Sequence, residues 1–349
     1  MKDEESEQSD RAGDAPLPRE TLALFGHDEA ESTLLQACQK GRLAHAWIIG
    51  GPEGIGKATL AWRFARFLLA HPDFSAPAVQ RAASLELPAD HPLARRVARG
   101  GHGNVFLLRR ELNEKGKMRT EIAVDSVRKV IEFFQLSAAE GGWRICIVDS
   151  AEDLNKNSAN ALLKLIEEPP AQSIFLIISQ KPGQILPTIR SRCRQLMLHA
   201  LGESHLLAAV AALPVKHDPA VLRRALPRAD GSVRELLRLV DPKTQKFDQK
   251  LSAALERLPQ VDWREVHSLA DAVAGRTGDA AYDALVRGVF AHIDRWLQAG
   301  VASGIPVGQL ARLAEAWEKL RDSIREAEAL NLDRRALVLG MFGDLAGAG

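Results

Sequence analysis

One octapeptide, GPEGIGKA, has the residue types and spacing of a phosphate-binding loop with one substitution. Gly51, Gly54 and Gly56 allow consecutive backbone N–H groups to face one concavity at the start of a helix, where they and the Lys57 ammonium bind phosphate oxygens. The next residue is normally Ser or Thr, whose hydroxyl coordinates Mg²⁺, but here it is Ala58. A methyl group is not a metal ligand, so the loop predicts weak binding of ATP or ADP, no metal site and impaired hydrolysis.

A carboxylate follows the apolar run 145–148. Asp149 stands where P-loop proteins place the acid that holds Mg²⁺, often through water. Ser150 comes next, and a serine hydroxyl cannot act as the base that activates water at neutral pH. Glu152 is an alternative base, although its position at the start of a loop gives no reason to expect the right reach. The departures at Ala58 and Ser150 weaken the same reaction by different routes, and together they predict a non-catalytic subunit.

Strands and helices must position these residues, and the hydropathy pattern predicts both. Apolar runs alternate with amphipathic stretches as far as residue 200, which is typical of an α/β domain with a largely parallel sheet and flanking helices. The predicted strands are 46–49, 105–108, 144–148, 174–178 and 195–198. The predicted helices are 60–69, 124–135 and 158–168. Asn157 or Ser158 is the expected N-cap of the last helix, and the stretch 72–103 gives only a weak helical signal.

The pattern divides the chain into four parts. Residues 1–18 are rich in Asp, Glu, Ser and Gln, and we predict a disordered acidic tail there. Residues 19–200 form the α/β domain. Beyond it the strand signal ends, and short helical segments predict a small helical lid over 201–246. Residues 247–349 are again helical, and apolar residues recur at three- and four-residue steps over 310–327, a stripe that is more often core than partner interface.

Composition and charge exclude several classes of protein. The 349 residues are 46% hydrophobic and 26% charged, and no run approaches the roughly 18 apolar residues of a membrane span. The formal net charge is +1, and no patch of basic and aromatic residues is present, so a stand-alone nucleic-acid binder is disfavoured. The three cysteines lie far apart, which predicts reduced thiols. We expect a cytoplasmic protein that does not enter a membrane.

Three further motifs extend the match around the loop. LAHAW occupies 43–47, NALLKLIEEPP occupies 160–170 and TIRSRC occupies 188–193. With these motifs, the region 22–240 resembles bacterial clamp-loader subunits of the AAA+ family, most closely the delta-prime branch. The remainder is similar only in its helical content. The resemblance implies a AAA+ α/β domain, a helical lid and a helical collar that builds a hetero-oligomer.

The resemblance also implies a function in DNA replication. It places the chain in the DNA polymerase III holoenzyme, in a pentameric complex with ATP-driven motor subunits of the gamma/tau type and a clamp-opening delta subunit. This complex loads the sliding clamp onto primer-template DNA. The chain itself would be a structural partner without a polymerase active site and without efficient ATPase activity.

Individual residues take roles from the resemblance. Arg192 corresponds to an arginine finger that acts in trans on the nucleotide of the neighbouring subunit, an effect worth about 10³ to 10⁵ in rate in other NTPases. From its spacing alone, Arg192 is equally well explained as a surface arginine paired with a local acid. Ser179 corresponds to the first nucleotide sensor and Arg234 to the second, although an arginine in the first turn of a helix is more often solvated. Active family members usually carry Glu where this chain has Ser150.

Many family members carry a four-cysteine zinc module between the P-loop helix and the next strand. No cysteine lies between Cys38 and Cys146, so this set of ligands cannot form. We therefore expect no zinc and no required cofactor.

Two enzyme classes are alternatives to a structural partner. The first is a catalytically active motor ATPase of the gamma/tau type, which Ala58 and Ser150 disfavour. The second is a P-loop kinase that acts on a small metabolite, which would need a metal-binding hydroxyl and a substrate-binding insertion. Neither feature is visible in the sequence.

Overall fold

The chain forms two compact units, and the boundary between them along the sequence falls between Arg238 and Leu239. The structure is a computed structural model that describes residues 15–113, 118–135, 141–274, 278–303, 307–330 and 332–348. The predicted lid over 201–246 is divided by the boundary between the units. Residues 1–14 of the predicted tail lie outside the described residues, whereas Leu17, also assigned to the tail, is buried.

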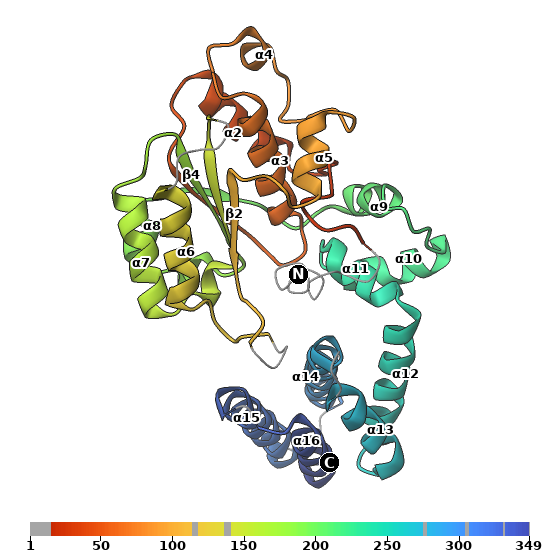
Figure 1. The fold of residues 1–349 in the computed structure, drawn as a ribbon. Coiled ribbons are helices and arrows are strands. Elements are labelled where there is room, and N and C mark those ends of the chain that lie inside the picture. Colours follow the sequence, from red (N-terminus) through yellow and green to blue (C-terminus); the bar gives the residue numbers. More distant parts are fainter. Residues whose placement is uncertain are drawn as a thin grey trace. The chain divides into compact units, whose positions relative to one another are not determined.

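The first unit is built on a parallel sheet, in which the described strands follow the order β2-β3-β4-β1-β5 (Figure 1). The strands are β1 (Ala46–Gly50), β2 (Val105–Arg109), β3 (Arg144–Asp149), β4 (Ser173–Ser179) and β5 (Arg194–Met197). Parallel neighbours require crossover connections, and helices between the strands provide them. The predicted α/β class is confirmed, and so are the predicted strands, each within two residues at its ends.

Helices cover both faces of the sheet (Figure 1). On one face lie α2 (Asp28–Gln39), α3 (Lys57–Ala70), α4 (Pro77–Gln80) and α5 (Pro92–Ala98). On the other face lie α6 (Val124–Gln135), α7 (Lys156–Glu167) and α8 (Pro187–Arg190). Alternate strand residues serve the two layers: Ile145 and Ile147 pack with α3, whereas Cys146 and Val148 pack with α6 and α7. The weak helical signal over 72–103 corresponds to α4 and α5.

Helix α7 begins two residues earlier than predicted. Its N-cap is Asn155, whose side-chain oxygen accepts hydrogen bonds from the backbone N–H groups of Asn157 and Ser158 at 3.1 and 2.9 Å. The predicted caps, Asn157 and Ser158, were therefore wrong. The reason is that a cap lies two or three residues before the N–H groups that it satisfies, and of the asparagines on either side of Lys156 the earlier one fills this position.

Two arginines of α3 hold the segment that precedes α2. Arg66 donates to the carbonyl oxygens of Arg19 and Thr21 at 3.0 and 2.8 Å, and Arg63 donates to that of Leu22 at 2.6 Å. Burial lowers the pKa of Arg66 to about 10. The guanidinium groups thus satisfy backbone carbonyls that have no partner in a helix or strand.

Helices make up the rest of the described chain. The sheet is followed by α9 (Glu203–Ala211), α10 (Pro219–Ala225) and α11 (Val233–Val240), and the second unit contains α12 (Pro242–Glu256), α13 (Trp263–Ala274), α14 (Gly278–Ala302), α15 (Val307–Leu330) and α16 (Arg334–Ala348). Leu320 and Ile324 of the predicted apolar stripe pack into the core of the second unit with Phe342. The stripe is therefore core along this part of α15.

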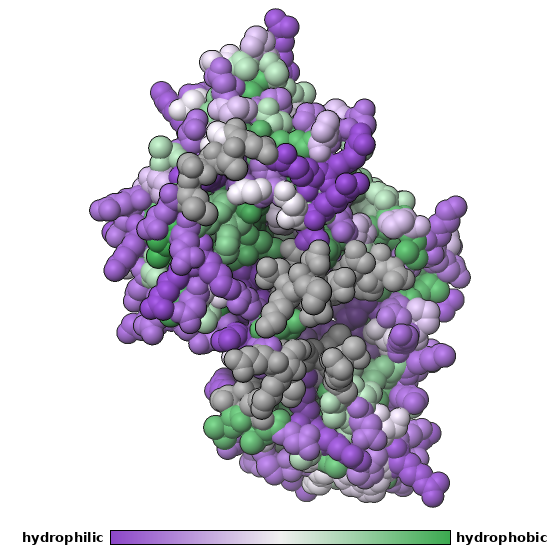
Figure 2. Space-filling model, in the orientation of Figure 1, coloured by the Kyte–Doolittle hydropathy of each residue, from purple (hydrophilic) through white to green (hydrophobic). Residues whose placement is uncertain are grey.

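The surface is predominantly hydrophilic on the face shown in Figure 2, where apolar residues form small, separate patches. Among the helices that the structure describes, none is long and apolar enough to cross a membrane.

Candidate nucleotide-binding site

The predicted phosphate-binding loop connects β1 to α3 at the carboxyl end of the sheet. Gly51, Gly54 and Gly56 have φ angles of 143°, 72° and 107°, which residues with a side chain rarely adopt. A Cβ atom at Gly51 would lie 2.4 Å from the carbonyl oxygen of Leu198. The three glycines thus have the strained backbone that the sequence motif requires, and nucleotide binding by the loop stays a prediction.

Lys57 is buried and turned onto its own loop. Its Nζ donates to the carbonyl oxygen of Gly51 at 2.8 Å and to that of Pro52. Burial lowers the pKa of Lys57, while the negative charges of Asp149 and Glu53 act in the opposite direction. Two of the three ammonium protons are therefore held by loop carbonyls that a bound phosphate would have to displace.

The sheet brings Asp149 and Ser179 to the same edge as the loop. They are the last residues of β3 and β4, and β4 lies between β3 and β1. Burial raises the pKa of Asp149, and the positive charges of Arg109, Lys57 and Arg234 act to lower it, in that order. The acid is therefore surrounded by cationic side chains on the loop side of the sheet.

Glu152 joins the ends of β3 and β4 through hydrogen bonds. The Ser150 hydroxyl donates to its Oε2 at 2.6 Å, and the Ser179 hydroxyl and the Lys181 backbone N–H donate to its Oε1, the latter at 2.5 Å. Burial alone would raise the pKa of Glu152, but these hydrogen bonds outweigh it and hold the pKa below its ordinary value. The protons of both serine hydroxyls are thus bound to Glu152, and both oxygens of its carboxylate accept hydrogen bonds from the protein.

We expect Glu152→Gln to destabilise the first unit by about 1–2 kcal/mol at pH 7, because an amide replaces one acceptor oxygen by a donor. The depressed pKa of Glu152 stabilises the fold above the unfolded-state pKa of about 4.3, and this contribution is lost as the pH falls through the folded-state pKa. The difference between wild type and variant should therefore shrink in acid. Urea unfolding at several pH values measures this difference in the free energy of unfolding. Glu168→Gln, at an exposed position, is the control. A difference that stays constant from pH 7 to pH 3 would contradict the hydrogen-bond network around Glu152.

Helix α11 places Arg234 beside the loop. The backbone N–H groups of Val233 and Arg234 donate to the carbonyl oxygen of Gly54 at 3.0 and 3.4 Å, and Arg234 Nε lies 3.5 Å from a carboxylate oxygen of Glu53. A Cβ atom at Gly54 would lie 2.3 Å from Ser232 Oγ and 2.5 Å from Arg234 Cβ. The first turn of α11 is therefore packed directly on the phosphate-binding loop.

Gly54→Ala should separate α11 from the loop. The substitution combines a positive φ with two steric clashes, so we expect a loss of about 2 kcal/mol in the stability of this contact. Hydrogen exchange at the Val233 amide, which donates to the Gly54 carbonyl, reports the separation. Gly183→Ala is the matched control, because no atom would lie within 4 Å of its new Cβ. Equal protection of Val233 in the two variants would argue against the contact.

Arg192 lies away from the loop, beyond the amino end of β5. The first residue of that strand, Arg194, pairs with Trp47 in β1. The Arg192 guanidinium donates to the carbonyl oxygen of Thr188 at 3.0 Å and forms an ion pair with Glu167 at 2.9 Å, with side chains 42% and 40% exposed. The structure therefore groups the loop, Asp149, Ser179 and Arg234, and leaves Arg192 outside that group. The local ion pair is present, and action in trans stays a prediction.

Sequence reasoning missed two residues of this site. His27, just before α2, is buried and its Nε2–H donates to the carbonyl oxygen of Ile55 at 2.7 Å; burial lowers its pKa. Arg109 ends β2 opposite Asp149 in the register of the sheet. A charged residue at the end of an apolar strand was a usable signal for Arg109, but the order of the strands was needed to give it a partner.

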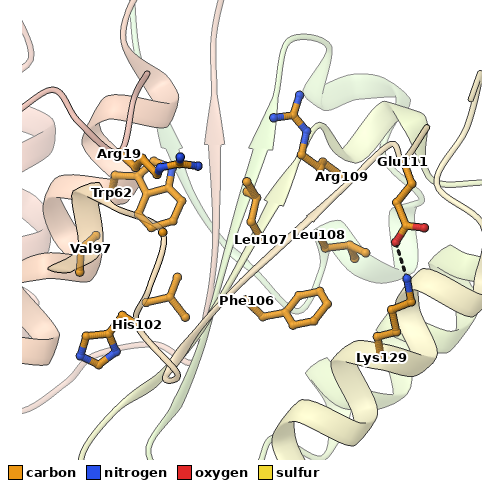
Figure 3. A pocket seen from close by; sticks show the side chains of 12 residues that line it. Arg19, Trp62, Val97, His102, Phe106, Leu107, Leu108, Arg109, Glu111 and Lys129 are labelled. Carbon is orange, nitrogen blue, oxygen red and sulfur yellow. Dashed lines mark hydrogen bonds and ion pairs between the residues drawn. The ribbon is translucent and has the colours of Figure 1, made fainter. Parts of the chain in front are cut away.

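A cavity of about 270 Å³ adjoins the edge strand β2 (Figure 3). Its lining includes Trp62 of α3, Val97 of α5 and Phe106 of β2, together with Arg109. No residue of the phosphate-binding loop contributes to it. Arg109 is thus shared between the cavity and the candidate site, and the rest of the cavity is separate from the loop.

The cysteines are free thiols. Burial raises the pKa of Cys38 and of Cys193 to about 12, so both are unreactive near neutral pH. Over the described ranges, no group of three or more His, Cys, Asp or Glu residues is placed to hold a metal ion. The expectation that zinc is not required stays a prediction.

Comparison with known proteins identifies relatives of this chain. Residues 26–202 match the profile of the family described as DNA polymerase III, delta subunit. The chain is 39% identical over 152 residues to DNA polymerase III subunit delta' of Pseudomonas aeruginosa, a match covering 44% of this chain and 42% of that protein. It is 31% identical over 233 residues to subunit delta' of Escherichia coli, covering 66% of this chain and 65% of that protein.

A further relative is DNA polymerase III subunit tau of Escherichia coli, 24% identical over 277 residues, covering 75% of this chain and 39% of that protein. In each case the chain spans less than two thirds of the relative's own length. The family profile covers just over half of the chain, and the resemblance to clamp-loader subunits is confirmed. The chain therefore belongs to the DNA polymerase III delta subunit family.

Proposed function

We propose that the chain is a clamp-loader subunit of the delta-prime type, which promotes ATP hydrolysis by neighbouring motor subunits and hydrolyses none itself. The observation that carries the proposal is the position of Arg192. Arg194 pairs with Trp47, four residues before Gly51, which is about 13 Å along the strand direction at 3.3 Å per residue. Arg192 comes two residues earlier, with its guanidinium on the surface and directed to Glu167. A side chain in this position can contact a nucleotide bound by a neighbouring subunit, but not a nucleotide bound by the loop of the same chain.

The loop side of the molecule supports the non-hydrolysing half of the proposal. Ala58 offers no oxygen to a metal, and Ser150 stands where a water-activating acid would be needed. Glu152, the alternative base, already accepts hydrogen bonds at both of its carboxylate oxygens. Lys57 is bound to loop carbonyls. On this basis any ATP or ADP binds weakly, through the loop, Lys57 and Arg234.

The relatives support the proposed partners, because they are named as delta', tau and gamma subunits of DNA polymerase III. We propose that the chain assembles with gamma/tau motor subunits and a clamp-opening delta subunit in the cytoplasm. In that complex it would contact the sliding clamp and primer-template DNA through its partners. The second, helical unit would supply the collar that holds the oligomer together.

The isolated chain provides the test. We expect no steady-state ATP hydrolysis above the level of the Lys57→Ala variant, and we expect the chain to co-elute with cognate gamma/tau and delta subunits in size-exclusion chromatography. Hydrolysis that Lys57→Ala abolishes would favour an active motor ATPase instead. Failure to co-elute with either type of subunit would overturn the proposed assembly.

A further inference from the structure

A P-loop fold implies a magnesium ion, and the residues of this site do not fit one. The ion is ordinarily held by the hydroxyl that follows the loop lysine and by an acid at the end of a neighbouring strand. Here the first ligand is replaced by the methyl group of Ala58. The second, Asp149, lies among positive side chains that would repel a divalent cation.

Arg109 is placed to be the principal neighbour of Asp149. The two residues are Cα partners at the carboxyl ends of β2 and β3, where adjacent strands lie about 4.8 Å apart. Because side chains alternate along a strand, Arg109 faces the same side as Leu107, and Asp149 faces the same side as Ile147. Leu107 and Ile147 both pack in the core on the α3 side of the sheet. The guanidinium and the carboxylate therefore project from neighbouring strand ends on the same face of the sheet, the face that α3 covers.

For each of the two groups, the other is the charge with the strongest effect on its pKa. Among the cations that lower the pKa of Asp149, Arg109 is the strongest, ahead of Lys57 and Arg234. Burial lowers the pKa of Arg109, and Asp149 is the strongest charge that opposes this effect. Two other acids near the end of β2 have partners of their own: Glu111 pairs with Lys129 at 2.7 Å, and Asp153 pairs with Arg110 at 2.9 Å. Arg109 points away from the Glu111–Lys129 pair in Figure 3.

We propose that Arg109 is the permanent counter-ion of Asp149 and occupies the electrostatic role that Mg²⁺ has in P-loop proteins that hydrolyse ATP. A guanidinium tethered to β2 neutralises the acid permanently, whereas a metal ion exchanges with solvent. The loop, Lys57, Arg109 and Arg234 then form a site for a polyphosphate anion that does not need a divalent metal. This inference rests on the non-hydrolysing half of the proposed function and is independent of Arg192.

Stability and metal binding of the full chain test the proposal without any ATP hydrolysis. A double-mutant cycle of Arg109→Met and Asp149→Asn should be non-additive. The unfolding equilibrium constant of the double variant should be about tenfold smaller than the value obtained by multiplying the two single effects. Removal of Arg109 leaves a half-buried carboxylate without its cation, and Asp149→Asn removes that carboxylate.

Manganese alone serves as the probe for the metal position, with free Mn²⁺ measured by electron paramagnetic resonance. We expect Arg109→Met to bind one Mn²⁺ at least about tenfold more tightly than wild type, and we expect Asp149→Asn to remove this gain. Arg110→Met is the matched control, since the neighbouring Arg110 pairs with Asp153 at 2.9 Å and should leave Mn²⁺ binding unchanged.

If Arg109→Met does not fold, Arg109→Lys, which retains the positive charge, replaces it. This variant should fold and exclude Mn²⁺ as wild type does, and its effect should be nearly additive with that of Asp149→Asn, because the charge pair is retained. An additive cycle of Arg109→Met and Asp149→Asn, an Arg109→Met variant that binds Mn²⁺ no more tightly than wild type, or an Arg109→Lys variant that binds it more tightly than wild type would overturn the proposal. None of these results would bear on assembly or on Arg192, so failure here is distinguishable from failure of the proposed function.

Discussion

Replacing Arg192 by alanine should slow ATP hydrolysis by the assembled complex and leave assembly intact. A guanidinium that neutralises charge on a transferring phosphoryl group is worth about 10³ to 10⁵ in rate. We therefore expect the one nucleotide that receives this arginine to be hydrolysed at least about 10³-fold more slowly, while the other nucleotides in the complex are hydrolysed normally. Single-turnover hydrolysis by cognate gamma/tau and delta subunits with the Arg192→Ala chain would show this fraction as a separate slow phase.

The structure supplies the controls for this experiment. Arg192 and Glu167 form a surface ion pair, and such pairs contribute about 0–1 kcal/mol, so the variant should fold and assemble. Arg190→Ala removes a nearby arginine at the end of α8 and should leave all phases fast. Arg192→Lys keeps the charge but not the planar fork and should restore only part of the rate. A reaction with no slow phase in Arg192→Ala would remove this residue from the mechanism.

The largest effect on stability should come from Arg63→Met in α3. Arg63 Nε lies 2.7 Å from Glu31 Oε1, and the two side chains are 7% and 10% exposed. Glu31 also accepts a hydrogen bond from the Leu85 backbone N–H at 2.7 Å, so removal of Arg63 leaves a buried carboxylate with one neutral donor. Breaking a buried pair in this way costs about 3–5 kcal/mol. We expect a loss of about 3 kcal/mol from the first unit.

Urea unfolding read by hydrogen exchange measures this loss, because exchange at the strands reports the first unit apart from the second. Arg128→Met is the matched control: its ion pair with Asp125 has the same 2.7 Å separation, but the side chains are 67% and 75% exposed. The control should change stability by less than about 0.5 kcal/mol. Similar losses in the two variants would contradict a stabilising role for the buried pair.

Local sequence features were sufficient to predict most of the first unit. Buried parallel strands are short apolar runs bounded by polar residues, and the five predicted strands are present for that reason. The loop glycines were identifiable because their spacing reflects backbone conformations that other residues avoid. The cap of α7 was missed because two asparagines, Asn155 and Asn157, have the same local preference, and the geometry of the first turn selected Asn155.

The charge balance of the site was harder to predict, because it depends on contacts between distant segments. Arg109 and Asp149 are 40 residues apart, and only the strand order makes them neighbours. The bonds from Ser179 and Lys181 to Glu152 likewise require the ends of β3 and β4 to meet. Residue types alone indicated what the site lacks, namely an alcohol at Ala58 and an acid at Ser150. They did not indicate which side chains pair with the charged groups that the site does contain.

The central claim is that this chain promotes ATP hydrolysis by its neighbours through Arg192 and performs none through its own loop. DNA-stimulated hydrolysis by cognate gamma/tau and delta subunits tests it most directly, when the complex is completed with wild type, Lys57→Ala or Arg192→Ala in parallel. We predict that wild type and Lys57→Ala raise turnover equally, and that Arg192→Ala raises it less, because the nucleotide that receives Arg192 no longer contributes. Either of two results would contradict the claim: loss of turnover with Lys57→Ala, or full turnover with Arg192→Ala.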